Sequence, residues 1–234
     1  MITHHNSQVG GKVIHIILDA LFPPKCAGCG VGKVRICKAC AKESEYRGSE
    51  CFFCGTKAGA THICLLCTKN NTLEGIFWPW RYNTKRARAI IAAYKYRKKR
   101  ALARALAGEL SGVLLAASLP DDLIAIPVPL HPGKLLERGF NQAGLLAECL
   151  GMPVVQDAVI RTKETPPQAR AATRGEREAQ VKGAFAVARE DLIREKNILI
   201  IDDVATTGAT IREVAKVLKK SGAGKLYAAV IAHG

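Results

Sequence analysis

The sequence predicts an α/β protein in which a doubly wound, mainly parallel sheet follows a small metal-binding module. Beyond residue 73, apolar strand-like runs alternate with helical patterns, which is typical of parallel sheets. One of these runs, residues 197–202, ends in two acidic residues and leads through a glycine-containing turn into a helix. Eight of the nine cysteines fall before residue 70, in pairs of the form C-x-x-C. These observations indicate two domains, residues 1–72 and residues 73–234.

The expected elements can be placed in chain order. A helix at 13–21 leads through Pro23 and Pro24 into the cysteine pairs, and residues 75–82 form an edge strand that opens the second domain. Further strands are expected at 123–128, 154–161, 184–188, 197–202 and 226–231, and helices at 86–94, 101–117, 141–150 and 210–221. The 234 residues suffice for one full core and a small accessory domain.

The cysteine spacing predicts two zinc sites. Two thiolates three positions apart can hold one side of a tetrahedral zinc ion, and a second pair closes the site. We favour sequential sites, one from Cys26, Cys29, Cys37 and Cys40 and one from Cys51, Cys54, Cys64 and Cys67, although spacing alone also permits interleaved pairs. Few large apolar residues lie between 23 and 70, so metal binding should supply most of the folding energy there. His62 is expected in a solvated loop, with metal ligation as the alternative, and Cys149 as a buried thiol.

Disulfide bonds are the alternative use of these cysteines, and they require an oxidising compartment. The apolar N-terminal segment is interrupted by His15 and Asp19, and it lacks the basic leader and cleavage site of a secretion signal. No run approaches the roughly 18 apolar residues of a membrane span. We therefore expect a cytoplasmic protein that is not embedded in a membrane.

The formal charge of +15 is concentrated near the domain junction, where no acidic residue occurs between Gly75 and Gly108. The basic residues there are Arg81, Lys85, Arg86, Arg88, Lys95, Arg97, Lys98, Lys99, Arg100 and Arg104, interleaved with Trp78, Trp80, Tyr82, Tyr94 and Tyr96. Basic residues with aromatic side chains between them suit single-stranded DNA, because cations follow phosphates and rings stack on bases. The alternative is a solvated helix face carrying Lys85, Arg88, Lys95 and Lys99, with Ile90, Ile91 and Tyr94 in the core.

The segment NILIIDDVATTGATI, residues 197–211, predicts a site for a ribose 5-phosphate. Asp202 and Asp203 come at the carboxyl end of a buried strand, where open α/β sheets bind ligands. Their carboxylates can accept hydrogen bonds from ribose hydroxyls. The phosphate would lie in the loop at the start of the next helix, bound by Ala205, Thr206, Thr207, Gly208, Ala209 and Thr210. The alternative is an ordinary helix capped by a threonine.

This segment resembles the 5-phosphoribosyl-1-pyrophosphate (PRPP) binding motif of type I phosphoribosyltransferases. Two further segments should meet it at the same edge of the sheet. Arg138 could bind a pyrophosphate through bidentate hydrogen bonds, whereas Asn141 is expected only to cap the following helix. The polar stretch 161–182, which contains Arg177, is expected to be an active-site lid, with a disordered surface loop as the alternative.

The whole set of motifs resembles the ComF family of competence-related proteins. The segments that carry the resemblance are the C-x-x-C pairs, Lys95-Tyr96, PVPLHP from 127, RGFNQ from 138, TPPQ from 165, Gly183-Ala184-Phe185 and IDDVATTGAT from 201. One departure is that Gln180 stands where the family commonly has asparagine. The resemblance implies a type I phosphoribosyltransferase-like domain behind a double zinc ribbon, in proteins that handle imported single-stranded DNA during natural transformation.

The resemblance also sets the expected ligands and partners. PRPP would bind with Mg²⁺, and Arg138 and Arg177 would be the catalytic pair that neutralises the departing pyrophosphate. Whether turnover occurs is left open. Besides two Zn²⁺ ions and single-stranded DNA at residues 81–104, a DNA-uptake helicase or translocase is an expected partner. The alternative is a metabolic phosphoribosyltransferase that acts on a nucleobase or an amine, with purely structural zinc ribbons.

Overall fold

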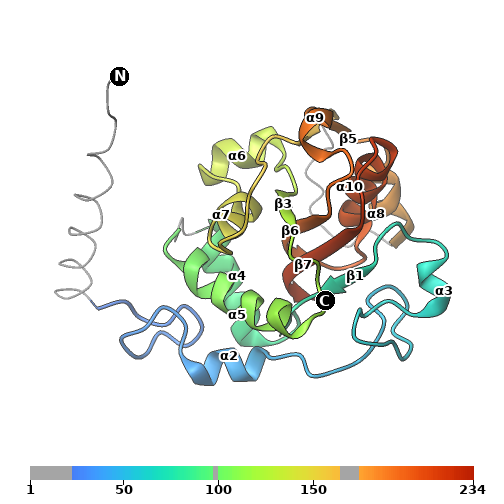
Figure 1. Ribbon diagram of the computed structural model, residues 1–234. Helices are drawn as coiled ribbons and strands as arrows, with labels where there is room; N and C mark the ends of the chain where they lie inside the picture. The colour runs from blue at the N-terminus through green and yellow to red at the C-terminus, as the bar shows by residue number, and fades with distance from the viewer. Residues whose placement is uncertain (1–22, 97–99, 164–173) are drawn as a thin grey trace.

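The computed structural model describes residues 23–96, 100–163 and 174–234, so the helix expected at 13–21 lies outside the described residues (Figure 1). The predicted α/β class is confirmed. Within these residues the main sheet has five strands, in the order β1-β7-β6-β3 with β2 also on β7, and every pairing is parallel. The strands are β1 (Gly75–Phe77), β2 (Trp80–Arg81), β3 (Ile124–Pro127), β6 (Ile198–Ala205) and β7 (Leu226–His233).

Helices cover both faces of this sheet, which is why its central strands are apolar throughout. One face packs against α4 (Lys85–Tyr96), α5 (Leu102–Ala116) and α7 (Gln142–Glu148), and the other against α10 (Ala209–Lys220). Leu199 and Ile201 belong to the core on the α4 side, whereas Ile198 and Ile200 belong to the core on the α10 side. Side chains along β6 therefore alternate between two helical layers, as the pleat of a strand requires.

Several predicted elements differ from the observed ones. The edge strand predicted at 75–82 is divided into β1 and β2 at Pro79, which has no N–H group for the ladder. The strand predicted at 154–161 was mostly wrong, because only β4 (Val159–Arg161) forms. It pairs antiparallel with β5 (Phe185–Val187) in a separate sheet, while Val154 makes a single bridge to Ala125. Five helices of the described residues were not predicted. Three lie beyond residue 73, namely α6 (Pro132–Arg138), α8 (Arg174–Val181) and α9 (Glu190–Ile193), and the other two lie in the cysteine-containing segment.

The cysteine-containing segment lies along one edge of the sheet domain, close to the C-terminus of the chain (Figure 1). Its helices are α2 (Lys38–Ser44) and α3 (Leu65–Thr68). Cys26 and Cys40 are buried in the same core cluster as Ile90 of α4. The segment therefore packs into the sheet domain, and the boundary at residues 72 and 73 stays a prediction. No helix of the described residues is long and apolar enough to cross a membrane.

Candidate ribose phosphate site

The two acidic residues of the motif lie within β6, which continues to Ala205, three residues beyond the predicted strand end. Because successive side chains of a strand point to opposite faces, Asp203 shares the α4 side with Ile201, and Asp202 shares the α10 side with Ile200. Asp203 is buried, and Asp202 lines a cavity of about 160 Å³. Residues 205–210, the candidate phosphate loop, line the same cavity. The two carboxylates thus lie on opposite faces of β6, one toward α4 and one toward α10.

Lys95 at the end of α4 is the partner of Asp203, with 2.8 Å between Lys95 Nζ and Asp203 Oδ1. Burial alone would lower the pKa of Lys95, but the Asp203 carboxylate outweighs it and leaves this pKa above its ordinary value. Lys95 was expected on an exposed helix face, either contacting DNA or in solvent, and that prediction was wrong. The Lys95-Tyr96 pair, which contributed only to the family resemblance, was the signal that could have identified it.

Asp202 has a pKa well above its ordinary value. Burial and the neighbouring charge of Asp203 raise its pKa to about 7, although Lys95 and Arg138 act in the opposite direction. Its Oδ1 accepts a hydrogen bond from the backbone N–H of Asp203 at 2.8 Å. In the free protein, Asp202 is therefore partly protonated at neutral pH.

The raised pKa of Asp202 predicts a pH-dependent stability. Between about pH 4 and pH 7 the folded protein holds a proton that the unfolded chain, with its ordinary pKa of 3.8, has released. The free energy of unfolding attributable to this group should therefore fall as the pH rises through that window, then level off. Asp202→Asn removes the effect, so the stability of the variant relative to the wild type should increase from pH 5 to pH 7 in urea titrations. Parallel pH profiles of the two proteins would contradict the assignment.

The loop after β6 has the geometry expected of an anion-binding turn. Gly208 has a φ of 71° and is the N-cap of α10, so the loop turns sharply and the helix points its N-terminal N–H groups into it. Thr207 Oγ1 accepts a hydrogen bond from Ala209 N at 3.4 Å. Loop residues 204–211 line the same cavity as Asp202. The capping interpretation accounts for Thr207 but leaves Thr206 and Thr210 at the cavity to be explained.

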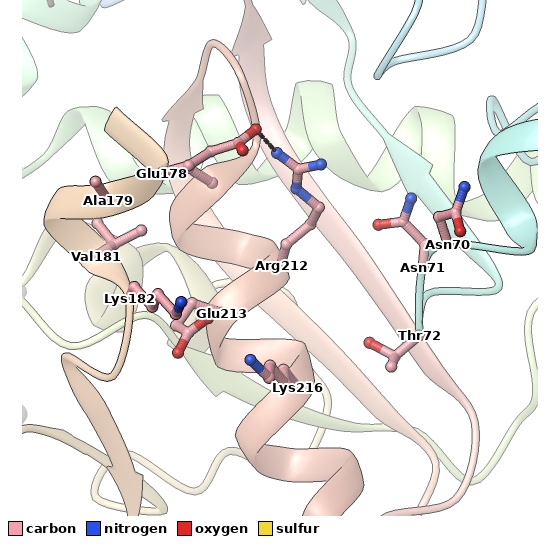
Figure 2. Close-up of a pocket in the computed structure, with 11 residues that line it drawn as sticks. Asn70, Asn71, Thr72, Glu178, Ala179, Val181, Lys182, Arg212, Glu213 and Lys216 are labelled. Atoms are coloured by element: carbon pink, nitrogen blue, oxygen red, sulfur yellow. Dashed lines mark hydrogen bonds and ion pairs between the residues drawn. The ribbon is translucent and has the colours of Figure 1, made fainter. Parts of the chain in front are cut away.

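Arg177 of α8 reaches this loop. Its guanidinium donates to Thr206 Oγ1 at 2.9 Å, and Arg177 and Gln180 both line the cavity. A second contact joins α8 to α10, because Arg212 of α10 forms an ion pair with Glu178 of α8 (Figure 2). Residues 164–173 of the expected lid lie outside the described residues. Its part from Arg174 to Val181 is the helix α8, which contacts the loop through Arg177.

Arg138, at the end of α6, is buried beside the ring of Tyr96, with its Cζ 5.1 Å from the ring centroid. It donates to Gln142 Oε1 at 3.0 Å. Arg138 Nε and Gln142 Nε2 have no hydrogen-bond partner among the described residues, although both atoms are buried. Buried donors without acceptors are costly, so this corner suits an anion such as pyrophosphate. Asn141 caps α7 by accepting from Ala143 N at 3.1 Å.

The eight paired cysteines come together in two groups in sequential order. They are Cys26, Cys29, Cys37 and Cys40 in the first cluster and Cys51, Cys54, Cys64 and Cys67 in the second, and the sulfur atoms within each lie within 4.8 Å of one another. Four sulfur donors at this spacing fit a tetrahedral zinc ion. Burial would raise the pKa of Cys26, but N–H groups such as that of Cys37, which donates at 3.3 Å, lower it to about 6.

The environments of His62 and Cys149 differ in part from those expected. His62 lies in a loop, as expected, but it is half-buried and its ring lies against that of Trp78, with centroids 4.7 Å apart. It is not among the grouped metal ligands. Cys149 is half-buried against the α4-side core, and burial raises the pKa of its thiol. The alternative of disulfide bonds finds no support in the described residues, where all nine cysteines are free.

The basic region is partly built into the fold. Trp78, Trp80 and Tyr94 are buried, so they are core residues and cannot stack on bases. Ile90, Ile91 and Tyr94 face the core as the helical pattern predicted. Arg86 is half-buried and joins α4 to the first zinc ribbon, the segment around the Cys26–Cys40 cluster. Its guanidinium donates to the Glu43 carboxylate and to the carbonyl oxygen of Gly28, each at 3.2 Å. The exposed basic residues that remain in the described part of this region are Arg81, Lys85, Arg88, Arg100 and Arg104.

Comparisons with known proteins agree with this architecture. A phosphoribosyl transferase domain family matches residues 135–234, and a double zinc ribbon domain family matches residues 17–70. The fold is therefore a phosphoribosyltransferase domain joined to a double zinc ribbon.

Individual relatives indicate the family to which the chain belongs. The chain is 30% identical over 205 residues to the DNA utilization protein YhgH of Salmonella typhi, covering 80% of this chain and 86% of that protein. It is 36% identical over 109 residues to competence protein F of Haemophilus influenzae, covering 44% and 46%. It is 25% identical over 232 residues to competence protein ComFC of Bacillus subtilis, covering 93% and 94%. The chain belongs to the ComF family, as its motifs predicted.

Proposed function

We propose that this protein binds PRPP at the carboxyl end of β6 and uses this domain to handle single-stranded DNA. The observation that carries the proposal is the Lys95–Asp203 ion pair beside Asp202 and the phosphate loop. The ion pair fixes the carboxylate of Asp203. The carboxylate of Asp202 lies at a small cavity that is also lined by the N-terminus of α10. A furanose with vicinal ring hydroxyls and a phosphate on its exocyclic carbon matches that combination of groups.

Each part of PRPP has matching groups in the site. Asp202 and Asp203 would accept hydrogen bonds from the ribose hydroxyls, and the loop from Ala205 to Thr210 would bind the 5-phosphate. Arg138 would bind the pyrophosphate, and the unpartnered donors around it support this role. Mg²⁺ bound to the pyrophosphate would neutralise part of its charge with few direct protein ligands. Arg177 contacts Thr206, so it would reach the site from the 5-phosphate end.

If turnover occurs, the same residues would stabilise its transition state. An oxocarbenium-like centre would develop at C1 of the ribose as the bond to pyrophosphate breaks. Arg138 would then stabilise the negative charge on the leaving group, with Arg177 closing the other end of the site. If no acceptor enters, these residues serve only to bind the ligand.

Arg138→Gln is expected to separate the two ends of the ligand. The variant should bind PRPP about 10- to 100-fold more weakly, because a buried charged hydrogen bond contributes roughly 1.5–3 kcal/mol. Ribose 5-phosphate lacks the pyrophosphate and should bind both proteins equally well. Isothermal titration calorimetry with both ligands measures this, and Arg189→Gln serves as a control, since Arg189 pairs with Asp157 on the surface. Equal losses for both ligands would show that Arg138 is only structural.

The DNA part of the proposal predicts a change in salt dependence. Lys85, Arg88 and Arg104 are exposed on α4 and α5, and replacing all three by glutamine should weaken oligonucleotide binding. The slope of log affinity against log salt should become shallower by about 2, because each phosphate contact on a single strand contributes about 0.7. The control replaces Lys196, Lys220 and Lys225, which are equally exposed but lie near the amino ends of β6 and β7. Equal slopes for both triple variants would exclude this surface.

One pair of assays distinguishes the proposal from a metabolic phosphoribosyltransferase. Pyrophosphate release from PRPP is measured with a panel of nucleobases and amines, beside a salt titration of oligonucleotide binding. PRPP binding with salt-sensitive DNA binding supports the proposal. Turnover with one acceptor and no salt-sensitive DNA binding would replace it with the metabolic function.

A further inference from the structure

The second zinc ribbon touches the phosphate loop directly. Phe52 and Phe53 lie between Cys51 and Cys54, and both rings pack against Gly208. A Cβ atom added to Gly208 would lie 2.6 Å from Phe52 Cε1 and 3.0 Å from Phe53 Cε1. The loop glycine is therefore required both by its positive φ and by these two rings.

Each ring also contacts a second group that bears on the loop. Phe52 lies against the ring of His233, with centroids 4.1 Å apart, and His233 Nε2 lies 3.2 Å from the carbonyl oxygen of Thr206. Phe53 lies under the guanidinium of Arg212, whose Cζ is 5.2 Å from the ring centroid. Arg212 belongs to α10 and is the residue that pairs with Glu178 of α8 (Figure 2). The two rings thus pack against the loop, the strand end and the helix that follows.

The other half of the same cysteine cluster provides a comparison within the molecule. Leu65 and Leu66 occupy the matching positions between Cys64 and Cys67, yet they are 86% and 75% exposed. Phe52 and Phe53 are 4% and 6% exposed. Each C-x-x-C turn of the cluster is a knuckle. The Cys64–Cys67 knuckle therefore exposes its apolar pair to solvent, whereas the Cys51–Cys54 knuckle buries its pair against the candidate ligand site.

We propose that the Cys51–Cys54 knuckle is a positioning element of the phosphate loop, so that zinc in the second cluster and ribose phosphate in the loop are coupled. Zinc would fix the knuckle, and the knuckle would hold Phe52 and Phe53 where they keep the loop closed. An anion-binding loop needs its N–H groups already oriented, because orienting them on binding costs conformational entropy. This inference rests on the proposed function and adds a control of the same site by the ribbon.

Coupling of this kind must act in both directions. If zinc in the second cluster strengthens ribose 5-phosphate binding by some factor, bound ribose 5-phosphate strengthens zinc retention by the same factor. The first cluster packs against α4, so its zinc should respond less. Ligand binding should therefore slow the release of one zinc ion and leave the other nearly unchanged.

The decisive variant exchanges the side chains of the buried pair for those of the exposed pair. The double variant Phe52→Leu and Phe53→Leu converts C-F-F-C to C-L-L-C, keeps all eight cysteines and keeps apolar side chains at both positions. It should retain two zinc ions per chain and bind ribose 5-phosphate about tenfold more weakly, within the usual range of coupling between sites. The matched control, Leu65→Phe and Leu66→Phe, makes the reverse exchange at the exposed knuckle and should bind as the wild type does.

Zinc release supplies the second readout. The full-length protein is mixed with a chromogenic chelator, with and without saturating ribose 5-phosphate. In the wild type and the leucine-to-phenylalanine control, the ligand should slow the loss of one zinc ion. In the Phe52→Leu and Phe53→Leu variant this slowing should be lost.

The outcomes separate the inference from the proposed function. Wild-type affinity and wild-type ligand-dependent zinc release in the Phe52→Leu and Phe53→Leu variant would overturn the inference alone. Equal weakening in both double variants would also overturn it, since the effect would then not depend on contact with Gly208. Failure of the wild type to bind ribose 5-phosphate or PRPP at all would overturn the proposed function and the coupling with it.

Discussion

Replacement of Asp202 and Asp203 by asparagine should weaken PRPP binding by about 100-fold or more. An amide accepts weaker hydrogen bonds than a carboxylate, and two charge-assisted bonds at roughly 1.5–3 kcal/mol each account for the loss. The Asp203 change has a further cost, because Lys95 would keep its charge in a half-buried position without a counter-charge. Calorimetric titration with PRPP measures the effect.

Zinc content gives the first control for this prediction, since neither aspartate belongs to a cysteine cluster. Both single variants and the double variant should keep two zinc ions per chain. A second control replaces Asp157 and Asp191 by asparagine, because these carboxylates pair with Arg189 on the surface. PRPP affinity within about threefold of the wild type in the Asp202 and Asp203 variants would refute the assigned roles.

The second large effect is expected at the first cysteine cluster. Replacing Cys26 and Cys40 by serine should remove one zinc ion and lower the free energy of unfolding of the whole protein by at least about 3 kcal/mol. Both cysteines are buried in the core cluster that contains Ile90 of α4. The loss of metal would therefore weaken the packing around Ile90, and the effect on stability would not stay within the ribbon.

Cys149→Ser is the matched control for this change. Cys149 is half-buried but lies outside both clusters, so its variant should keep two zinc ions and lose only about 1 kcal/mol. Elemental analysis gives the metal content, and urea unfolding gives the stability. Loss of zinc with an unchanged unfolding midpoint would mean that the first ribbon folds independently of the sheet domain.

The sequence predicted the features that depend on local pattern. The strand–acid–glycine–helix order at 197–211 determines the local geometry of the site, because a buried strand, a turn and a helix N-terminus follow each other directly. The cysteine pairs are equally local, and each cluster uses neighbouring pairs. The family resemblance joined these pieces into one architecture.

What the sequence could not predict depends on where elements meet in space. Helical spacing groups Lys95 with Lys85 and Arg88, but the end of α4 lies beside Asp203, so the cation enters the site. Trp78 and Trp80 resembled exposed stacking residues in a basic segment, yet packing on both faces of the sheet edge buries them. The contact of Phe52 with Gly208 joins segments more than 150 residues apart, and periodic sequence patterns do not predict such a contact.

The shared core also limits how this chain can be dissected. Cutting it after residue 72 would uncover Ile90 on one side and the face of Trp78 that packs against Phe52 and Tyr46 on the other. Such a fragment would carry new apolar surface next to its own ligand loop, which favours aggregation. Genetic truncations that delete the cysteine region would therefore be expected to disable both halves together, and their phenotypes would not assign separate tasks to either one.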